Sequence, residues 1–293
     1  MTKFSIRVVM CMFAWLFCLQ SSLAADTWSY PSKKPDKSLG GGRGYINDPY
    51  LIKTAQQLAD FAWLVNNGNS YSGEYVALAA NITLNDIIFD DNNEPTNLKE
   101  LKAWTNIGEY GSLSNDYFKG FFDGRDHTIS GLYVNVDKDE YTGLFGALYG
   151  EVSNLNIKDS YILGDGGNDA TGFLVGYMKC SVINNCHISN SHIDIATNTS
   201  SNIGGIAGQG SGDGKVVLAS SFSGTMNIHH SSGTVYVAGI MGLGAPKLEN
   251  CRVDGQMNLY AVKSDSKDEI YANGLCYEAA DITGCVNNLN FKL

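Results

Sequence analysis

The chain has 293 residues, of which 44% are hydrophobic and 17% charged, with 20 basic against 30 acidic side chains. This hydrophobic content can build a sizeable core, which argues against a largely disordered chain. The net charge of −10 repels phosphate backbones, so we expect no nucleic-acid partner.

Residues 1–25 have the pattern of an export signal. Two basic residues precede the apolar run 8–19, which is too short to span a bilayer, and small residues favour a cut near residue 25. Cys18 raises the alternative of a lipoprotein, although Phe17 stands where that processing favours a small residue. No later stretch approaches the ~20 apolar residues of a membrane helix. The sequence therefore predicts a secreted or cell-surface protein without a membrane span.

The first third of the mature chain differs from the rest. Residues 26–44 combine Pro, Lys and a run of Gly, which predicts a loose lead-in segment. One helix is predicted from Thr54 to Asn67, where Thr54 and Gln57 form a capping box and apolar residues recur at i, i+3, i+4 and i+7. Two strands, at 75–78 and 81–84, should follow it.

An acidic loop comes after these strands. Asp86, Asp90, Asp91 and Glu94 supply hard oxygen ligands, and outside the cell Ca²⁺ is the natural ion for such a loop. The loop lacks the Gly and the closing Glu of a helix-loop-helix calcium site. We therefore expect no cofactor, with calcium at this loop as the metal to test.

Residues 123–127 place two carboxylates, a guanidinium and an imidazole within five positions. Two carboxylates can serve as acid and base in carbohydrate cleavage. The Asp-Gly pair lies between two apolar pairs and is typical of a tight turn, so the structural interpretation is favoured.

Internal repeats dominate the rest of the chain. Each unit is a Gly-flanked apolar strand, a turn and a second alternating strand, and the second Gly recurs in steps of 30, 32 and 34 residues, with Tyr277 taking the fifth position after a further 35. No unit has a helical period, which excludes helical repeat arrays. Units that cannot bury an apolar face alone must stack, which predicts a β-solenoid. The glycine segments are 142–146, 171–176, 204–208, 238–242 and 273–277.

Alternation within these units predicts a row of equivalent interior residues. Five cysteines remain after the leader, and an odd number cannot all pair within the chain. We expect buried free thiols, with a Cys251–Cys285 bridge as the alternative. His187 and His192 should point outward onto a solvated face. The predicted interior row is Leu155, Cys186, Ser221, Cys251 and Cys285.

Three tyrosines near turns are the candidate ligand-binding residues. Tyr149 and Tyr177 lie just past the Gly of adjacent repeats, and Tyr117 lies near an earlier turn. Aromatic planes fit the apolar face of a pyranose ring, so these side chains could stack on sugars. The alternative is that they are ordinary strand or turn residues.

The repeats resemble those of secreted bacterial proteins with GLUG repeats, named for a Gly-Leu-x-Gly signature. The likeness includes an opening at 48–59 and two landmarks at 104–108 and 118–132, and it spans roughly residues 40–288. It implies an all-β, right-handed parallel β-helix-like solenoid at 136–293, behind an N-terminal cap with one helix and first strands at 45–135. It also implies adhesive or ligand-binding roles in exported proteins, and it supplies no catalytic motif.

Three functions remain open at this point. The favoured one is a secreted or cell-surface, non-enzymatic binding module that presents its solenoid face to a glycan or a host or cell-surface protein. The alternatives are a β-helix polysaccharide lyase or glycoside hydrolase, and a structural spacer. GLUG repeats also accompany immunoglobulin-cleaving metallopeptidases, but none of the five histidines is followed by Glu, so a His-Glu-x-x-His zinc helix is excluded.

Overall fold

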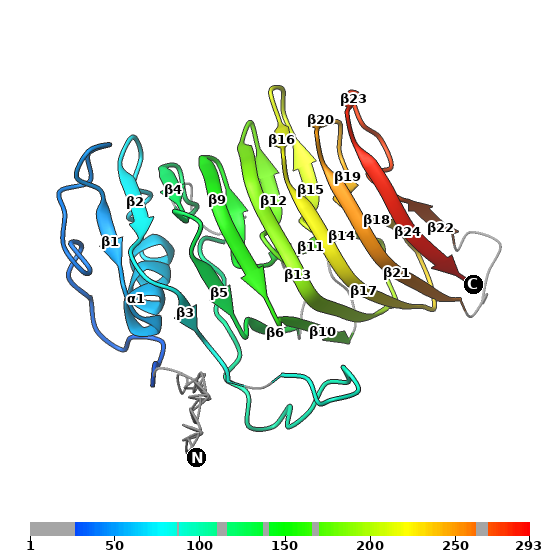
Figure 1. Ribbon diagram of the computed structural model, residues 1–293, viewed down its shortest axis with the longest axis horizontal. Coiled ribbons are helices and arrows are strands. Elements are labelled where there is room, and N and C mark those ends of the chain that lie inside the picture. The colour runs from blue at the N-terminus through cyan, green and yellow to red at the C-terminus, as the bar shows by residue number, and fades with distance from the viewer. Residues whose placement is uncertain (1–26, 87, 110–115, 137–140, 166–169, 262–268) are drawn as a thin grey trace, which may run out of the picture.

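The protein is a parallel β-solenoid with one helix near its N-terminal end (Figure 1). The computed structural model describes residues 27–86, 88–109, 116–136, 141–165, 170–261 and 269–293. The predicted export signal at 1–25 lies outside these residues. Within them, every pairing between named strands is parallel, which confirms the predicted fold class.

The described strands form three sheets that share one apolar core. The largest contains the long strands at the front of Figure 1. The strands of the second sheet come directly before the turn in each glycine segment, and those of the third sheet come directly after it. The first sheet contains β1 (Tyr50–Ile52), β2 (Tyr75–Leu78), β3 (Ile82–Thr83), β4 (Phe121–Asp123), β5 (Thr128–Ser130), β6 (Tyr133–Val136), β9 (Glu151–Lys158), β10 (Tyr161–Asp165), β13 (Val182–Thr197), β16 (Val216–Leu218), β17 (Ser221–His230), β20 (Lys247–Glu249), β21 (Arg252–Ala261), β23 (Asp281–Thr283) and β24 (Val286–Lys292). The second contains β7 (Tyr141–Thr142), β11 (Ala170–Gly172), β14 (Ser201–Gly204), β18 (Thr234–Ala238) and β22 (Glu269–Asn273), and the third β8 (Phe145–Leu148), β12 (Val175–Lys179), β15 (Ala207–Ser211) and β19 (Met241–Leu243).

Equivalent residues of successive repeats stack in the core. Ile183 of β13 is in register with Val152 on one side and Val217 on the other, and Val217 in turn with Leu248. All four side chains are fully buried. Because the pairing continues from β4 and β5 into β9, the sheet crosses the predicted boundary at residue 135, and that division stays a prediction.

The recurring glycines are required where two neighbouring rungs touch. A Cβ at Gly176 would lie 2.3 Å from the backbone nitrogen of Thr142, and a Cβ at Gly208 would lie 2.3 Å from that of Thr171. Real Cβ atoms do not approach a backbone atom so closely. The repeat signature therefore reflects close backbone contact between turns of the solenoid.

The helix α1 (Ala55–Asn66) begins and ends where the sequence predicts. The Thr54 hydroxyl accepts the N–H of Gln57 at 3.2 Å, but the Gln57 side chain accepts the N–H of Lys53 instead of closing a box on Thr54. The apolar side of α1 packs on the end of the core, where the Phe61 ring lies 5.4 Å from that of Phe118. The helix thereby covers the core at the end of the solenoid where β1 and β2 lie (Figure 1).

One corner of each rung has a left-handed backbone. Asn154, Asn185 and Asn250 occupy it with φ of 52°, 53° and 55°, and the Asn185 amide donates to Asn154 Oδ1 at 2.9 Å. The turn at 123–127 belongs to the same corner, since β4 and β5 on its two sides both pair with β9. It is a turn, as predicted, within the solenoid wall.

The interior row next to this corner contains Ser220, which corrects the prediction of Ser221. Ser221 pairs with His187, which leaves Ser220 opposite Cys186, and the Ser220 hydroxyl accepts the Cys186 N–H at 3.0 Å. Two adjacent serines made the phase of alternation ambiguous, and a slip of one residue exchanges the two faces of a strand. The five described cysteines are free thiols, and Cys251 and Cys285 are not bridged. Cys186, Cys251 and Cys276 are buried as predicted, whereas Cys285 is half-buried and Cys180 is exposed.

Candidate functional site

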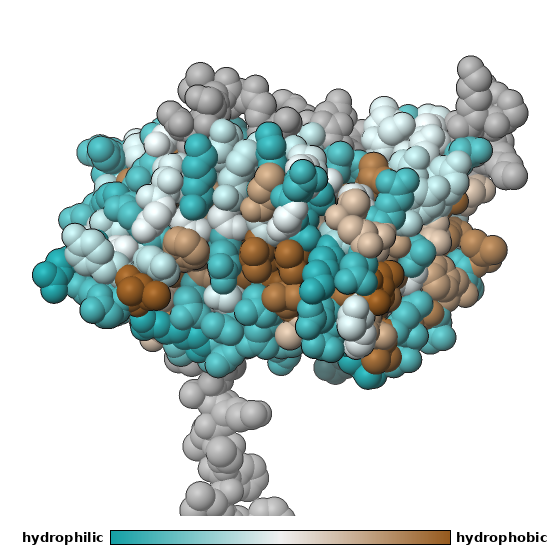
Figure 2. All heavy atoms as spheres, turned by 90° about the horizontal axis from the view of Figure 1, so that it is seen from above, coloured by the Kyte–Doolittle hydropathy of each residue, from teal (hydrophilic) through white to brown (hydrophobic). Residues whose placement is uncertain are grey.

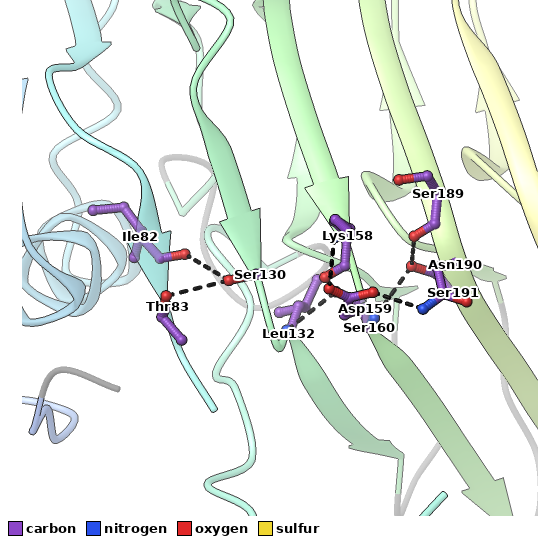
Figure 3. Close-up of polar contacts among 10 residues, drawn as sticks. All are labelled: Ile82, Thr83, Ser130, Leu132, Lys158, Asp159, Ser160, Ser189, Asn190 and Ser191. Atoms are coloured by element: carbon purple, nitrogen blue, oxygen red, sulfur yellow. Dashed lines mark hydrogen bonds and ion pairs between the residues drawn. The ribbon is translucent and has the colours of Figure 1, made fainter. Parts of the chain in front are cut away.

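A second left-handed corner is present in two neighbouring rungs of the largest sheet and is missing from the next rung. In the rungs of β9 and β13, Asp159 and Asn190 occupy this corner with φ of 50° and 46°, and the Asn190 amide donates to Asp159 Oδ1 at 2.6 Å (Figure 3). Hydroxyls support it: Ser191 Oγ accepts the Ser160 N–H at 3.2 Å, and Ser160 Oγ accepts the Leu132 N–H at 3.1 Å (Figure 3).

The extra corner residue is missing from the next rung. Strand β13 is in register with β17 up to Ser189 and again from Ser191, so Asn190 is a bulge without a counterpart. Glycines make this possible, because a Cβ at Gly224 would lie 1.9 Å from the Ser191 carbonyl oxygen, and one at Gly255 would lie 2.0 Å from that of Gly224. The outer surface therefore steps down after Asn190.

The step creates a groove of about 450 Å³ across four strands. Asn190 bounds it on one side, the two glycines form part of its floor, and Asn93 reaches it from the loop before β4. The lining residues are Asn93, Asn190, His192, Ser223, Gly224, Thr225, Gly255, Gln256 and Asn290.

A row of outward residues runs through the groove, perpendicular to the strands. His192 pairs with Thr225, Thr225 with Gln256, and Gln256 with Asn290. Neighbouring strands lie about 4.8 Å apart, so a ligand that follows the row meets a new side chain at each such step.

Some of these polar groups are held in place and others are free. The Gln256 amide donates to Asn258 Oδ1 at 2.6 Å, and the Asn258 amide donates to Asn227 Oδ1 at 2.7 Å. Among the residues that the structure describes, the side chains of Ser223, Thr225 and Asn290 have no hydrogen-bond partner. The groove thus combines an oriented amide with donors and acceptors that a ligand can use.

The groove has no aspartate, glutamate, lysine or arginine in its described lining. Two aspartates close to the groove, Asp159 and Asp254, form ion pairs with neighbouring basic side chains. Asp159 is 3.2 Å from the Lys158 ammonium, and hydrogen bonds from Arg252 and then from Asn288 lower the pKa of Asp254. The described lining thus differs from the rest of a protein whose net charge is −10.

His192 is covered by the loop, which corrects the prediction of a solvated histidine. The residue is only 8% exposed, because the Asn93 amide lies 2.9 Å from Nε2 and the centroid of the Phe89 ring lies 4.4 Å from that of the imidazole. Burial lowers the pKa of His192, although Glu94 and Asp194 act in the opposite direction. Alternation gave the correct face of the strand, but a loop about 100 residues earlier covers it.

The predicted calcium ligands lie on this same loop. The Asp90 carboxylate accepts the N–H groups of Asn92 and Glu94 at 2.8 and 3.0 Å, and these bonds lower its pKa, the Glu94 contact first. Asp86, Asp91 and Glu94 are exposed. Within the described ranges, no three His, Cys, Asp or Glu side chains are grouped to hold a metal ion. Calcium binding here stays a prediction.

The predicted tyrosines lie side by side on a different part of the surface. The rings of Tyr117 and Tyr149 stack with centroids 3.8 Å apart, and Tyr177 lies 6.3 Å from Tyr149. Lys119 lies over the Tyr117 ring at 4.7 Å, and Lys179 over Tyr149 at 5.6 Å.

These contacts limit how the tyrosines can meet a ligand. Tyr177 is only 6% exposed, and its hydroxyl contacts Ser211. The stacked faces of Tyr117 and Tyr149 contact each other, so a ligand would meet mainly ring edges and hydroxyls. Seen from above, the surface is largely hydrophilic and its apolar residues form separate groups (Figure 2). A sugar-binding role for the tyrosines stays a prediction.

The groove residues were not found from the sequence, although a signal existed. His192, Thr225, Gln256 and Asn290 are separated by 33, 31 and 34 residues, close to the steps of the glycine repeat. Polar residues at that period could have been aligned as one outward row. The bulge at Asn190, which makes the row a groove, has no comparable signature.

No family model matches the chain. A candidate Gly-rich membrane protein of Evansella cellulosilytica is 31% identical over 140 residues, which are 46% of this chain and 14% of that protein. Halomucin of Haloquadratum walsbyi is 28% identical over 178 residues, 59% of this chain and 2% of halomucin. The chain thus corresponds to a small part of each relative.

Two solved structures are similar at a low level. A candidate immunoglobulin A1 protease of Bacteroides ovatus has a TM-score of 0.42 at 19% identity, with 86% of this chain and 87% of that chain covered. A second structure, named IgA1 protease, has a TM-score of 0.32 at 15% identity and covers 82% and 21% of the two chains. Similarity of this degree assigns no activity.

The described part of the chain contains no helix that is long and apolar enough to cross a membrane.

Proposed function

We propose that this protein is an exported binding module that is displayed at the cell surface and holds an extended glycan or protein ligand without transforming it. The uncharged groove across β13, β17, β21 and β24 carries this proposal. Its volume is within the range of known ligand sites, and its side chains can orient a ligand by hydrogen bonds.

The sequence relatives and the leader support the surface location. One relative is named a Gly-rich membrane protein and the other halomucin, and a surface location of this chain agrees with the first of these names. The export signal predicted at residues 1–25 would direct the chain out of the cytoplasm. A cut near residue 25 would release the chain from its leader, whereas a lipidated Cys18 would attach it to the membrane surface.

The arrangement of carboxylates favours binding over cleavage. Glycoside hydrolases usually place two carboxylates on either side of the bond, and no carboxylate lines the groove in the described residues. In the 123–127 turn, Asp123 Oδ1 already accepts the Arg125 N–H at 2.9 Å and the Asn154 amide at 3.0 Å. These bonds stabilise the solenoid corner.

A glycan array probed with the exported protein, with and without calcium, tests the proposal. We expect retention of at least one class of polysaccharide, which is recovered intact after incubation. Shortened or unsaturated products would contradict a pure binding role and favour a lyase or hydrolase. Loss of binding without calcium would support the predicted ligands Asp86, Asp90, Asp91 and Glu94.

A parallel capture experiment with purified host-surface proteins covers the protein ligand. A module that binds neither glycans nor these proteins would contradict the proposed function and favour a structural spacer.

A further inference from the structure

We infer that the groove binds an uncharged, hydroxyl-rich polysaccharide whose chain runs along the solenoid axis, across the strands. This inference rests on the proposed binding function and specifies its ligand. The evidence is the chemistry of the lining, the direction of the side-chain row and the pairing of the strands beneath it.

The lining matches sugar hydroxyls in hydrogen-bonding character. A hydroxyl group both donates and accepts, and so do the hydroxyls of Ser223 and Thr225 and the amides of Gln256 and Asn290. An ionised group in the groove would favour a ligand of opposite charge, but none lines it in the described residues. Neutral sugars can therefore satisfy these groups without an uncompensated charge.

The direction of the ligand follows from the register. Thr225, Gln256 and Asn290 form a line across three adjacent strands, with Asn190 raised at one end. A polymer with a short repeat can contact this line at successive units about 4.8 Å apart. A compact ligand would use only part of it.

An extended peptide fits this surface less well. Peptides commonly add to a free strand edge or place side chains in apolar pockets. Strands β17 and β21 under the middle of the groove are each paired on both sides, so in the described residues a peptide could add only to the outer edge of β24, at the end of the row. The described lining contains no aliphatic side chain beyond the Thr225 methyl.

The net charge of the protein also selects among polysaccharides. At −10 the molecule repels anionic chains such as polygalacturonate, whereas it exerts no net force on a neutral chain. The groove itself offers no lysine or arginine, within the described ranges, to offset that repulsion.

Affinity electrophoresis and calorimetry with three neutral polysaccharides (a galactomannan, a xyloglucan and a yeast mannan) and with polygalacturonate test the inference. The variants are Thr225→Val, which removes one hydroxyl at constant shape, and Gln256→Glu, which replaces an amide donor by a negative charge. Thr234→Val is the matched control, since Thr234 is a similarly half-buried threonine on β18, in a different sheet.

We expect at least one neutral polysaccharide to bind, and polygalacturonate to bind more weakly. Thr225→Val should weaken the neutral interaction by about fivefold, the effect of one hydrogen bond, and Gln256→Glu by about tenfold or more. Thr234→Val should leave it unchanged. Circular dichroism of each variant shows whether the solenoid is intact.

Unchanged affinity for neutral polysaccharide in both folded groove variants would overturn the inference but leave the binding function standing. Stronger binding of polygalacturonate than of any neutral chain would also overturn it. Binding of proteins alone would do the same. The absence of any glycan or protein ligand would instead count against the proposed function.

Discussion

The left-handed corner next to β9, β13 and β17 shows how one residue sets local stability. Asparagine and glycine tolerate positive φ, whereas other residues lose about 1 kcal/mol or more there. Ala219 occupies this corner at φ 45°, between rungs that have Asn185 and Asn250 at the same place. Ala219 thus stands where both neighbouring rungs have an asparagine.

We predict that Ala219→Asn raises the free energy of unfolding by about 1 kcal/mol, through relief of backbone strain and a new amide in the asparagine stack. The opposite change, Asn185→Ala, should lower it by about 1–3 kcal/mol, because it also removes the hydrogen bond to Asn154. Urea unfolding measures both. Stabilisation by Asn185→Ala, or destabilisation by Ala219→Asn, would contradict this account of the corner.

The cysteines differ in reactivity because they differ in exposure. Burial raises the pKa of Cys186 to about 12 and that of Cys251 to about 11, whereas Cys180 is exposed. At about pH 8 we expect iodoacetamide to modify native Cys180 rapidly and Cys186 only after unfolding. Peptide mass spectrometry follows each site, and Cys180→Ser should remove the rapid phase. Equal native rates at Cys180 and Cys186 would contradict the buried row.

His192 should make the protein less stable in mild acid. Its pKa is lowered by burial, so below about pH 6.5 the unfolded chain binds more protons than the folded chain. Stability is then complete above that pH and is lost as the pH falls toward the folded pKa. Phe89 and Asn93 cover the ring, and Glu94 and Asp194 oppose the loss.

Thermal unfolding between about pH 7.5 and pH 5 measures this effect. His192→Gln, which keeps a polar group beside Asn93 but cannot titrate, should have a shallower decline than the wild-type protein. An identical pH slope in the two proteins would show that the covered histidine does not contribute.

At the scale of elements, the glycine turns determine how closely β11 and β12 approach the preceding rung. Gly176→Ala would place a methyl group 2.3 Å from the Thr142 backbone nitrogen, which cannot move without disturbing β7. We expect a loss of about 3 kcal/mol or more in the free energy of unfolding.

Gly214→Ala is the control that isolates backbone strain. Gly214 has positive φ, at 75°, which Gly176 does not, and a Cβ there meets nothing within 4 Å. Its substitution should cost only the backbone strain, about 1 kcal/mol. A loss for Gly176→Ala in urea unfolding no greater than that for Gly214→Ala would contradict contact between rungs as the reason for the repeat glycine.

At the scale of the whole molecule, the net charge and the groove lining differ in electrostatic character. The protein is acidic overall, yet the groove lining described here is neutral. We predict that the affinity for a neutral polysaccharide changes less than about twofold between about 0.05 M and 0.5 M NaCl, since screening acts only on charges. Calorimetry at several salt concentrations measures it. A decrease of about tenfold would indicate recognition through ion pairs.

Much of this architecture could be predicted because it is local or periodic in the sequence. The α1 pattern, the strand at 75–78 and the Gly-flanked repeats follow from hydrophobic spacing and from glycines that allow close backbone contact. Repeats must stack to bury their apolar faces, so the parallel solenoid follows as well. The prediction placed Ser221 instead of Ser220 in the interior row, because two adjacent serines do not show which of them points inward.

Tertiary structure alone decided where the groove lies. The groove depends on a one-residue bulge at Asn190 and on glycines that let the next rung lie flat. The covering of His192 depends on Asn93, which is distant in sequence and close only after folding. Composition and periodicity determined the solenoid, because its contacts repeat from rung to rung. The groove arises where that repetition is interrupted, and an interruption becomes visible only in three dimensions.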